Sequence, residues 1–416
     1  MRFNSFKSAA LLLAVLPLAF TACVKDKDTI TYTLFKPVFK EKSEVIAQVG
    51  SHAPRTISQS GKIYLYNQYI FLNDLGKGVH VIDNSNPATP QRIAFIDIPG
   101  NIDIAVKGNI LYADLYSDML AIDISNPLNA KITKQVSNVF PERNQWNPFY
   151  LDSSKYIVDW IKKDTTVTNT EFRSSCNGCV FSLANASASS VPKANISAGG
   201  SMSRFAIVND FLYTVSSNSL RANDISVPAD PQFKSIRGLG WDIETIYPFK
   251  DKLFIGSASG MFIFDINDPA QPVFKSAFSH ALACDPVVAD DSYAYVTLRA
   301  GTSCRGGDWS NQLDVINVQN LTSPALVRTY SLVNPYGLGK DGNLLWVCDG
   351  KAGLKLFDAS NPGDLKQLKV IGNIEAYDVI TLDGKMIVTA KDGLFQYDYS
   401  DTNDIRLISK IPITKS

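Results

Sequence analysis

The sequence predicts an all-β protein, a β-propeller of four-stranded blades, from the spacing of one recurring motif. Apolar runs that end in Asp or Asn and lead into a turn recur along the 416 residues, ending at Asp83, Asp123, Asp224, Asp265, Asn317, Asp358 and Asp398. The intervals between these positions are 40, 101, 41, 52, 41 and 40 residues. A period near 40 residues with about four short strands per unit is typical of propeller blades.

Turn chemistry accounts for the motif. The apolar and β-branched residues suit a buried strand. The Asp or Asn then bonds its own backbone, and an Asn-Pro or Asp-Pro pair such as Asp268-Pro269 starts a turn. We expect a strand after each turn, as at residues 92–96, and two strands before each motif, as at 102–106 and 110–113.

The interval of 101 residues needs a blade of its own. Residues 155–161 and 166–172 are expected to be paired strands, preceded by 149–151, in a degenerate third blade. Residues 173–201 are rich in Ser, Ala, Asn and Gly and are expected to form an inserted loop. The prediction is therefore eight blades within residues 43–416, or seven if the third blade does not form.

The N-terminus has the pattern of a secretory signal. Arg2 and Lys7 precede an apolar run over residues 9–20, too short for a comfortable membrane span. Residues 20–23, Phe-Thr-Ala-Cys, resemble a bacterial lipobox, which implies removal of residues 1–22 and lipidation of Cys23. The alternative is an ordinary signal peptide with an incidental cysteine.

Residues 23–42 are predicted to be a polar tether that follows the lipid-bearing cysteine. The charged run Val24-Lys25-Asp26-Lys27-Asp28 resembles the signal of surface-exposed lipoproteins of Bacteroidota. The expected location is the outer membrane with display on the cell surface, and the periplasmic face is the alternative. Membrane contact would come through the lipid alone.

The repeats themselves resemble the LVIVD-repeat proteins, a β-propeller family common among lipoproteins of Bacteroidota. Residues 78–83, Gly-Val-His-Val-Ile-Asp, and 353–358, Gly-Leu-Lys-Leu-Phe-Asp, carry this resemblance. It implies the fold and an envelope location. The family carries no established catalytic motif, so no functional residue transfers from it.

Composition and motifs argue against several functions. Forty Lys and Arg balance forty Asp and Glu, which gives no electrostatic reason to expect a nucleic-acid partner. The patterns of zinc proteases, phosphate-binding loops, serine hydrolases and calcium loops are missing from the sequence. The sequence therefore predicts a protein that is not an enzyme and has no cofactor and no metal.

Five cysteines remain after Cys23, and an oxidising envelope favours their pairing. A Cys176–Cys179 disulfide within the inserted loop is predicted, with half of a metal site as the alternative. Cys284 and Cys304 flank a strand pair and are predicted to form a second disulfide, which leaves Cys348 as a buried thiol. A three-thiol metal site of Cys284, Cys304 and Cys348 is the other possibility.

In a propeller, the loops leading into the innermost strands and those joining the second and third strands share the face around the central channel. Trp, Tyr and Arg most often anchor interfaces. The predicted binding face comprises Trp241, Glu244, His280, Asp285, Arg299, Arg305, Asp308, Trp309, Tyr336 and Tyr377, with residues 299–309 as its best patch. The competing interpretation is that each side chain packs a blade edge or solvates a loop.

These observations lead to a functional hypothesis. The propeller is a non-catalytic platform that binds a protein partner within an envelope assembly. A surface protein that binds carbohydrate or peptide is the first alternative. A propeller hydrolase or lyase that uses His280 and acidic residues is the second. Paired carboxylates in one pocket would favour the enzyme, whereas a shallow aromatic face would favour binding.

Overall fold

The computed structural model describes residues 29–145, 153–168, 200–240, 242–279, 286–300 and 311–413. The chain divides into two compact units, one of Met1–Val38 with Trp160–Ser190 and the other of Phe39–Asp159 with Val191–Ser416. Within the described residues, no helix has the length and apolar character needed to span a membrane.

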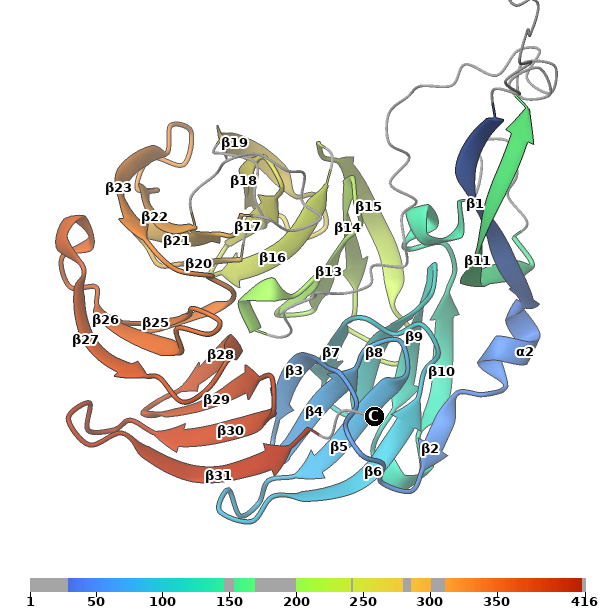
Figure 1. Cartoon of the computed structure of the whole chain (residues 1–416), viewed down its shortest axis with the longest axis horizontal. Helices are drawn as coiled ribbons and strands as arrows, with labels where there is room; N and C mark the ends of the chain where they lie inside the picture. The colour runs from blue at the N-terminus through green and yellow to red at the C-terminus, as the bar shows by residue number, and fades with distance from the viewer. Residues whose placement is uncertain are drawn as a thin grey trace, which may run out of the picture. The chain divides into compact units, whose positions relative to one another are not determined.

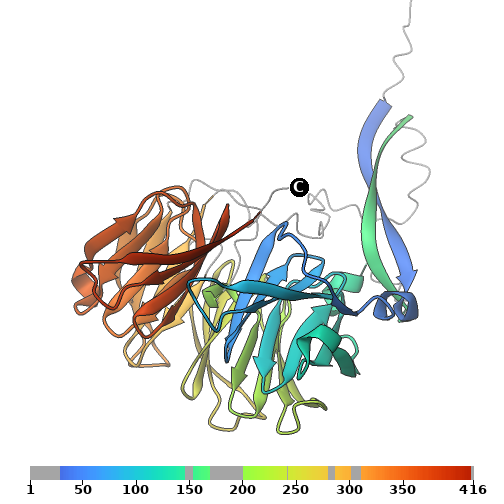
Figure 2. The same ribbon diagram turned by 90° about the horizontal axis from the view of Figure 1, so that it is seen from below.

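The larger unit contains seven four-stranded antiparallel sheets that follow one another around a ring in chain order (Figures 1 and 2). Blades 1 to 3 consist of β3 (Ser60–Tyr66), β4 (Tyr69–Asp74), β5 (Gly78–Asp83), β6 (Gln91–Asp97); β7 (Ile104–Lys107), β8 (Ile110–Leu115), β9 (Asp118–Asp123), β10 (Lys131–Val136); and β12 (Phe205–Val208), β13 (Phe211–Val215), β14 (Ser219–Asp224), β15 (Gln232–Gly238). A short strand, β2 (Gly50–His52), pairs with the outer edge of blade 1.

The remaining four blades repeat the same meander, in which each strand pairs with the next one along the chain. Blades 4 and 5 consist of β16 (Ile243–Phe249), β17 (Lys252–Ser257), β18 (Gly260–Asp265), β19 (Val273–Ser279); and β20 (Val287–Ala289), β21 (Tyr293–Leu298), β22 (Gln312–Asn317), β23 (Ala325–Ser331). Blades 6 and 7 consist of β24 (Leu338–Asp341), β25 (Leu344–Cys348), β26 (Leu354–Asp358), β27 (Lys366–Ile371); and β28 (Ala376–Leu382), β29 (Lys385–Ala390), β30 (Gly393–Asp398), β31 (Arg406–Pro412).

The propeller fold is confirmed, and the count is seven blades, the smaller of the two numbers considered. The extra third blade is wrong because residues 155–168 form one long strand, β11 (Lys155–Thr168), rather than a hairpin. Its partner is β1 (Thr29–Glu41), in a segment expected to be a polar tether. In the smaller unit, Thr31 and Thr166 share a hydroxyl hydrogen bond of 2.9 Å, and Thr33 donates to Asp164 at 2.6 Å.

Seven apolar clusters hold the ring together, and each one lies between two adjacent blades. The cluster between blades 7 and 1 includes Ile387 and Leu394 from one side and Ile63 and Leu72 from the other. All four strands of blade 7 are consecutive in the chain, so no shared strand closes the ring. Closure therefore depends on side-chain packing.

Each third strand ends in the same turn. The side chain of the last residue accepts a hydrogen bond of 2.8 to 3.0 Å from the backbone N–H two residues on, at Asp83, Asp123, Asp224, Asp265, Asn317, Asp358 and Asp398. In every blade, the pairing of the third and fourth strands also shifts register at a bulge. A bulge bends the strand and strengthens its twist, and it gives every outer strand the same distortion.

A buried carboxylate ties the start of the larger unit to blade 2. Both oxygens of Asp118 accept from Lys42 of α2 (Lys42–Ile46), at 3.1 and 2.9 Å, and Oδ2 also accepts from the Tyr156 hydroxyl of β11 at 2.8 Å. Burial opposes ionisation, but the hydrogen bonds from Asn138, Lys42 and Tyr156 outweigh it and lower the pKa of Asp118. The ionised form therefore stabilises this contact at neutral pH.

The turn at Asp224 yields a pH-dependent prediction. The Ser226 backbone N–H and hydroxyl and the Lys234 ammonium lower the pKa of Asp224 from 3.8 to about 2. Because the folded-state pKa is depressed, the stabilisation is complete above about pH 4 and is lost as the pH falls towards 2. Asp224→Asn keeps an acceptor for the Ser226 N–H but does not titrate.

We expect the melting temperature of the wild type to fall more steeply from pH 4 to pH 2 than that of Asp224→Asn. Thermal unfolding followed by circular dichroism at several pH values measures both slopes. Parallel slopes would show that the Asp224 carboxylate contributes no pH-dependent stability.

Candidate functional site

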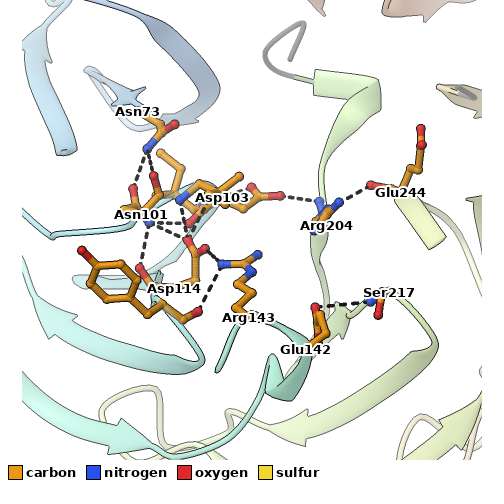
Figure 3. A network of polar contacts seen from close by, with 12 residues as sticks. Asn73, Asn101, Asp103, Asp114, Glu142, Arg143, Arg204, Ser217 and Glu244 are labelled. Atoms are coloured by element: carbon orange, nitrogen blue, oxygen red, sulfur yellow. Dashed lines mark hydrogen bonds and ion pairs between the residues drawn. The ribbon is translucent and has the colours of Figure 1, made fainter. Parts of the chain in front are cut away.

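Polar side chains gather around the propeller axis where the chain enters the innermost strands of blades 1 and 2. Asn73 Nδ2 donates to Asn101 Oδ1 at 2.6 Å, and Asn101 Nδ2 donates to Asp114 Oδ1 at 2.7 Å. Asp114 also accepts from Arg143, whose guanidinium lies over the Phe140 ring at 4.3 Å. Figure 3 shows this chain of contacts and, beside it, Arg204 between Asp103 and Glu244.

Three carboxylates on this face hold backbone in place. Asp74, Asp114 and Asp349 each accept hydrogen bonds from two consecutive backbone N–H groups that precede the innermost strand of their own blade. All three are buried. Because their oxygens are committed to fixing these loops, they are poorly suited to act as general acids or bases.

A second group of charges surrounds the buried amine of Lys62. Asp103 accepts from the backbone N–H groups of Arg204 and Ile104. Lys62 of β3 is 5% exposed, and its charge interacts with Asp103 and Asp378. Burial lowers the pKa of Lys62 although both carboxylates oppose the shift, and burial raises the pKa of Asp378 to about 8. This group therefore holds a lysine and a carboxyl that burial pushes towards their neutral forms.

A short 3₁₀ segment, η4 (Gly200–Met202), packs against the innermost strands β3, β16, β20, β24 and β28. Ser201 donates to Asp378 Oδ1 at 3.2 Å and accepts from the Leu338 N–H at 2.9 Å. Beneath it lies a cavity of about 380 Å³ that runs between six of the innermost strands, β3, β12, β16, β20, β24 and β28. The segment therefore covers one end of the central channel.

An aromatic pair flanks the charged group on blades 6 and 7. The rings of Tyr336 and Tyr377 lie 5.1 Å apart, and the Arg299 guanidinium lies 3.9 Å from the Tyr336 ring centre. Tyr377 donates to Glu375, which also pairs with Lys391 at 2.7 Å. Both tyrosines are half-buried and Arg299 is buried beneath them. We call Tyr336 and Tyr377 with Arg299 the tyrosine ledge.

The structure brings together part of the predicted binding face. Arg299, Tyr336 and Tyr377 form the tyrosine ledge, and Glu244 lies beside Arg204. Cys348 is a buried free thiol whose pKa is raised by that burial. The remaining predicted residues lie outside the described residues: Cys23, Cys176, Cys179, Trp241, His280, Cys284, Asp285, Cys304, Arg305, Asp308 and Trp309.

Sequence reasoning missed Lys62, Arg143, Ser201 and Arg204. Lys62 carried one detectable signal, since it is a charged residue that directly precedes the apolar run Ile63-Tyr64-Leu65 of an innermost strand. Ser201 and Arg204 carried none, because Ser201 is the last residue of the predicted inserted loop and Arg204 follows it closely. No group of three or more His, Cys, Asp or Glu side chains among the described residues is placed to hold a metal ion.

Comparison with known proteins supports a propeller of LVIVD repeats. Residues 59–94, 101–135, 199–237 and 283–331 match the model of the LVIVD repeat, on blades 1, 2, 3 and 5. No curated protein matches the sequence.

Several solved structures share the fold. A protein from Lactobacillus plantarum aligns over 88% of this chain and 97% of its own with a TM-score of 0.55 and 11% identity. The computationally designed Ika8 protein (86% and 89%, TM-score 0.52, 9% identity) and Sqt1 of Saccharomyces cerevisiae (87% of both chains, 0.52, 7%) are similar too. At these identities the likeness shows the fold alone.

Gly337 allows the Asp378 carboxyl to reach Ser201. A Cβ at position 337 would lie 1.9 Å from Asp378 Oδ1, whereas a Cβ at Gly372 would have nothing within 4 Å. We expect Gly337→Ala to destabilise the fold by about 1–3 kcal/mol, as overpacking of an interior does. Gly372→Ala should stay within about 0.5 kcal/mol of the wild type. Urea unfolding of both variants measures the difference, and equal stabilities would mean that Asp378 moves freely.

Proposed function

We propose that this propeller is a binding scaffold of the bacterial outer envelope and that a lipid on Cys23 anchors it. The propeller binds a protein partner on the face that carries the tyrosine ledge. The ledge is the single observation that carries the proposal. Two half-buried aromatic rings backed by a guanidinium give an anchor of low conformational entropy, the kind on which hot spots are built.

The distribution of carboxylates favours binding over hydrolysis on this face. Asp74, Asp103, Asp114 and Asp349 are occupied by backbone N–H groups, Asp378 accepts from Ser201 and the Val379 N–H, and Glu375 is paired with Lys391. A hydrolase or lyase would need two carboxyl groups free to exchange protons with a substrate in one pocket. The adjacent rings of Tyr336 and Tyr377 are suited to contact the surface of a protein partner instead.

The location rests on the sequence before the propeller. The apolar run, the small residues before Cys23 and the charged run after it are the features expected of a lipoprotein displayed on the surface of a Bacteroidota cell. A lipid anchor would tether the propeller without a membrane-spanning helix.

Anchoring predicts that Cys23→Ala releases the protein from the membrane fraction and abolishes its labelling by a clickable fatty acid. Each acyl chain contributes about 0.8 kcal/mol per buried CH₂ group, so its loss removes the attachment. Protease treatment of intact cells tests display on the surface. The lipid anchor would be overturned if the wild type took up no fatty-acid label and Cys23→Ala stayed in the membrane fraction to the same extent.

The tyrosine ledge predicts where a partner attaches. A photo-crosslinking residue in place of Tyr377 should capture a discrete protein in intact cells, whereas the same residue in place of Leu407, which is 54% exposed on the outer strand β31, should not. Truncating an interface anchor costs about 2–4 kcal/mol. The pair Tyr336→Ala and Tyr377→Ala should therefore reduce recovery of that protein by at least tenfold, with Leu407→Ala as the matched control.

An adduct that forms from position 407 but not from 377 would move the interface to the rim of the propeller. Equal recovery of the partner by the double variant, with an unchanged melting curve, would show that the tyrosine ledge does not anchor the partner.

A further inference from the structure

Arg299 is a buried arginine without a polar partner. It is 5% exposed, and it makes no hydrogen bond and no ion pair with any of the described residues. Every other arginine that the structure describes makes at least one such contact: Arg55, Arg92, Arg143, Arg204, Arg221, Arg237, Arg328 and Arg406. A buried charge is costly unless it is paired, so Arg299 needs an explanation that the other arginines do not.

One flat side of this guanidinium is occupied, but its edge is not. The central carbon lies 3.9 Å from the centre of the Tyr336 ring, so the ring covers one side. Contact of this kind leaves the N–H donors in the plane of the guanidinium. Nε is buried without a partner, whereas the two terminal nitrogens are not among the buried atoms that lack one and so remain in contact with solvent. A ligand can therefore reach the edge of the guanidinium.

No carboxylate of the described residues forms an ion pair with Arg299. Glu244 attracts it electrostatically without such a contact. Glu375 is already committed, because it accepts from the Tyr377 hydroxyl at 3.2 Å and pairs with Lys391 at 2.7 Å. Burial lowers the pKa of Arg299, but a guanidinium stays protonated at neutral pH. The tyrosine ledge thus contains a fixed positive charge.

The charge beside the ledge has the same sign. Lys351 is exposed, acts electrostatically on Glu375 and has no ion pair within the described part of the chain. It follows Gly350, which packs so closely on Tyr336 that a Cβ there would lie 3.0 Å from the ring. An unpaired arginine with a lysine nearby favours a ligand that carries a negative charge.

We propose that Arg299 binds the carboxylate of an Asp or Glu side chain of the protein partner, while Tyr336 and Tyr377 pack against the stem of that side chain. This inference rests on the proposed function, because it names the group that the tyrosine ledge recognises. A guanidinium edge binds a carboxylate through two parallel N–H···O hydrogen bonds. A slender side chain can reach an arginine that is 5% exposed, and its charge supplies the ion pair that Arg299 lacks.

Small probes test the site without the partner. In the full chain labelled with ¹⁵N-arginine, the Nε–Hε NMR signal of Arg299 is assigned by its loss in Arg299→Lys. The first probe is N-acetylglutamate methylamide, and N-acetylglutamine methylamide is its neutral analogue. N-acetylalanine represents a C-terminal carboxylate, and inorganic phosphate represents a different anion.

We expect millimolar N-acetylglutamate methylamide to shift the Arg299 signal saturably and the neutral analogue to leave it in place. The signal of Arg328, an exposed arginine that donates to the Gly363 carbonyl at 2.8 Å, should not move. No shift with the glutamate probe, or an equal shift with its neutral analogue, would overturn the proposal. A tighter response to N-acetylalanine or to phosphate would overturn the assignment to an acidic side chain.

Thermal stability separates a ligand site from a structural arginine. Arg299→Gln removes no ion pair, so its melting temperature should equal or exceed that of the wild type. Arg143→Gln should melt at a lower temperature, because it leaves the buried Asp114 carboxylate without its guanidinium. A fall for Arg299→Gln as large as that for Arg143→Gln would show that Arg299 holds the fold together, and would overturn the proposal.

Capture of the partner completes the test. With the photo-crosslinking residue at position 377, Arg299→Gln should reduce the adduct at least tenfold, whereas Arg328→Gln should leave it unchanged. An undiminished adduct with Arg299→Gln would overturn this inference and leave the scaffold function standing. If the wild type gives no adduct although the glutamate probe shifts the Arg299 signal, the proposed function fails and the carboxylate site stands.

Discussion

The burial of both faces of every sheet is the constraint on which this structure depends. A four-stranded blade has apolar side chains on its two faces, and only a closed ring gives each face a neighbour. The seven clusters between blades satisfy this requirement, and the cluster between blades 7 and 1 closes the ring without a shared strand. Asn84 and Gln396 exchange amide hydrogen bonds of 3.0 and 2.7 Å across that junction, so specific polar contacts fix the register in which the ring closes.

The turn after the third strand makes the blades alike. An Asp or Asn side chain accepts a hydrogen bond from the backbone N–H two residues later, which ends the strand and directs the chain towards the outer edge of the blade. The bulge that follows in all seven blades twists each outer strand in the same manner. Local side-chain chemistry, repeated about every 40 residues, thus gives the sheets a common shape, and a common shape lets successive blades pack in the same way around the axis.

The axis collects polar groups for two different purposes. Most of the buried carboxylates, such as Asp114 and Asp349, bind backbone N–H groups and hold the loops that lead into the innermost strands. Lys62 and Asp378 lie near η4, where burial lowers the pKa of Lys62 and raises the pKa of Asp378. The tyrosine ledge is formed by Arg299 after β21, Tyr336 before β24 and Tyr377 in β28, and so draws on blades 5, 6 and 7. A rigid ring therefore presents an aromatic surface at one place and buried charged groups beneath η4 at another.

The sequence by itself determined the all-β propeller and the positions of the turns that end the third strands, because turn chemistry and strand patterns depend on neighbours in the chain. It named Arg299, Tyr336 and Tyr377 only as candidates for a binding face, and packing between three blades brought them into contact. It did not determine the number of blades. Residues 155–168 have the composition of a blade strand, but their partner is a segment more than a hundred residues earlier, and no local signal encodes such pairing. Only the tertiary structure brought Lys62, Ser201 and Asp378 together, because they lie on separate parts of the ring and meet only when the ring closes around η4.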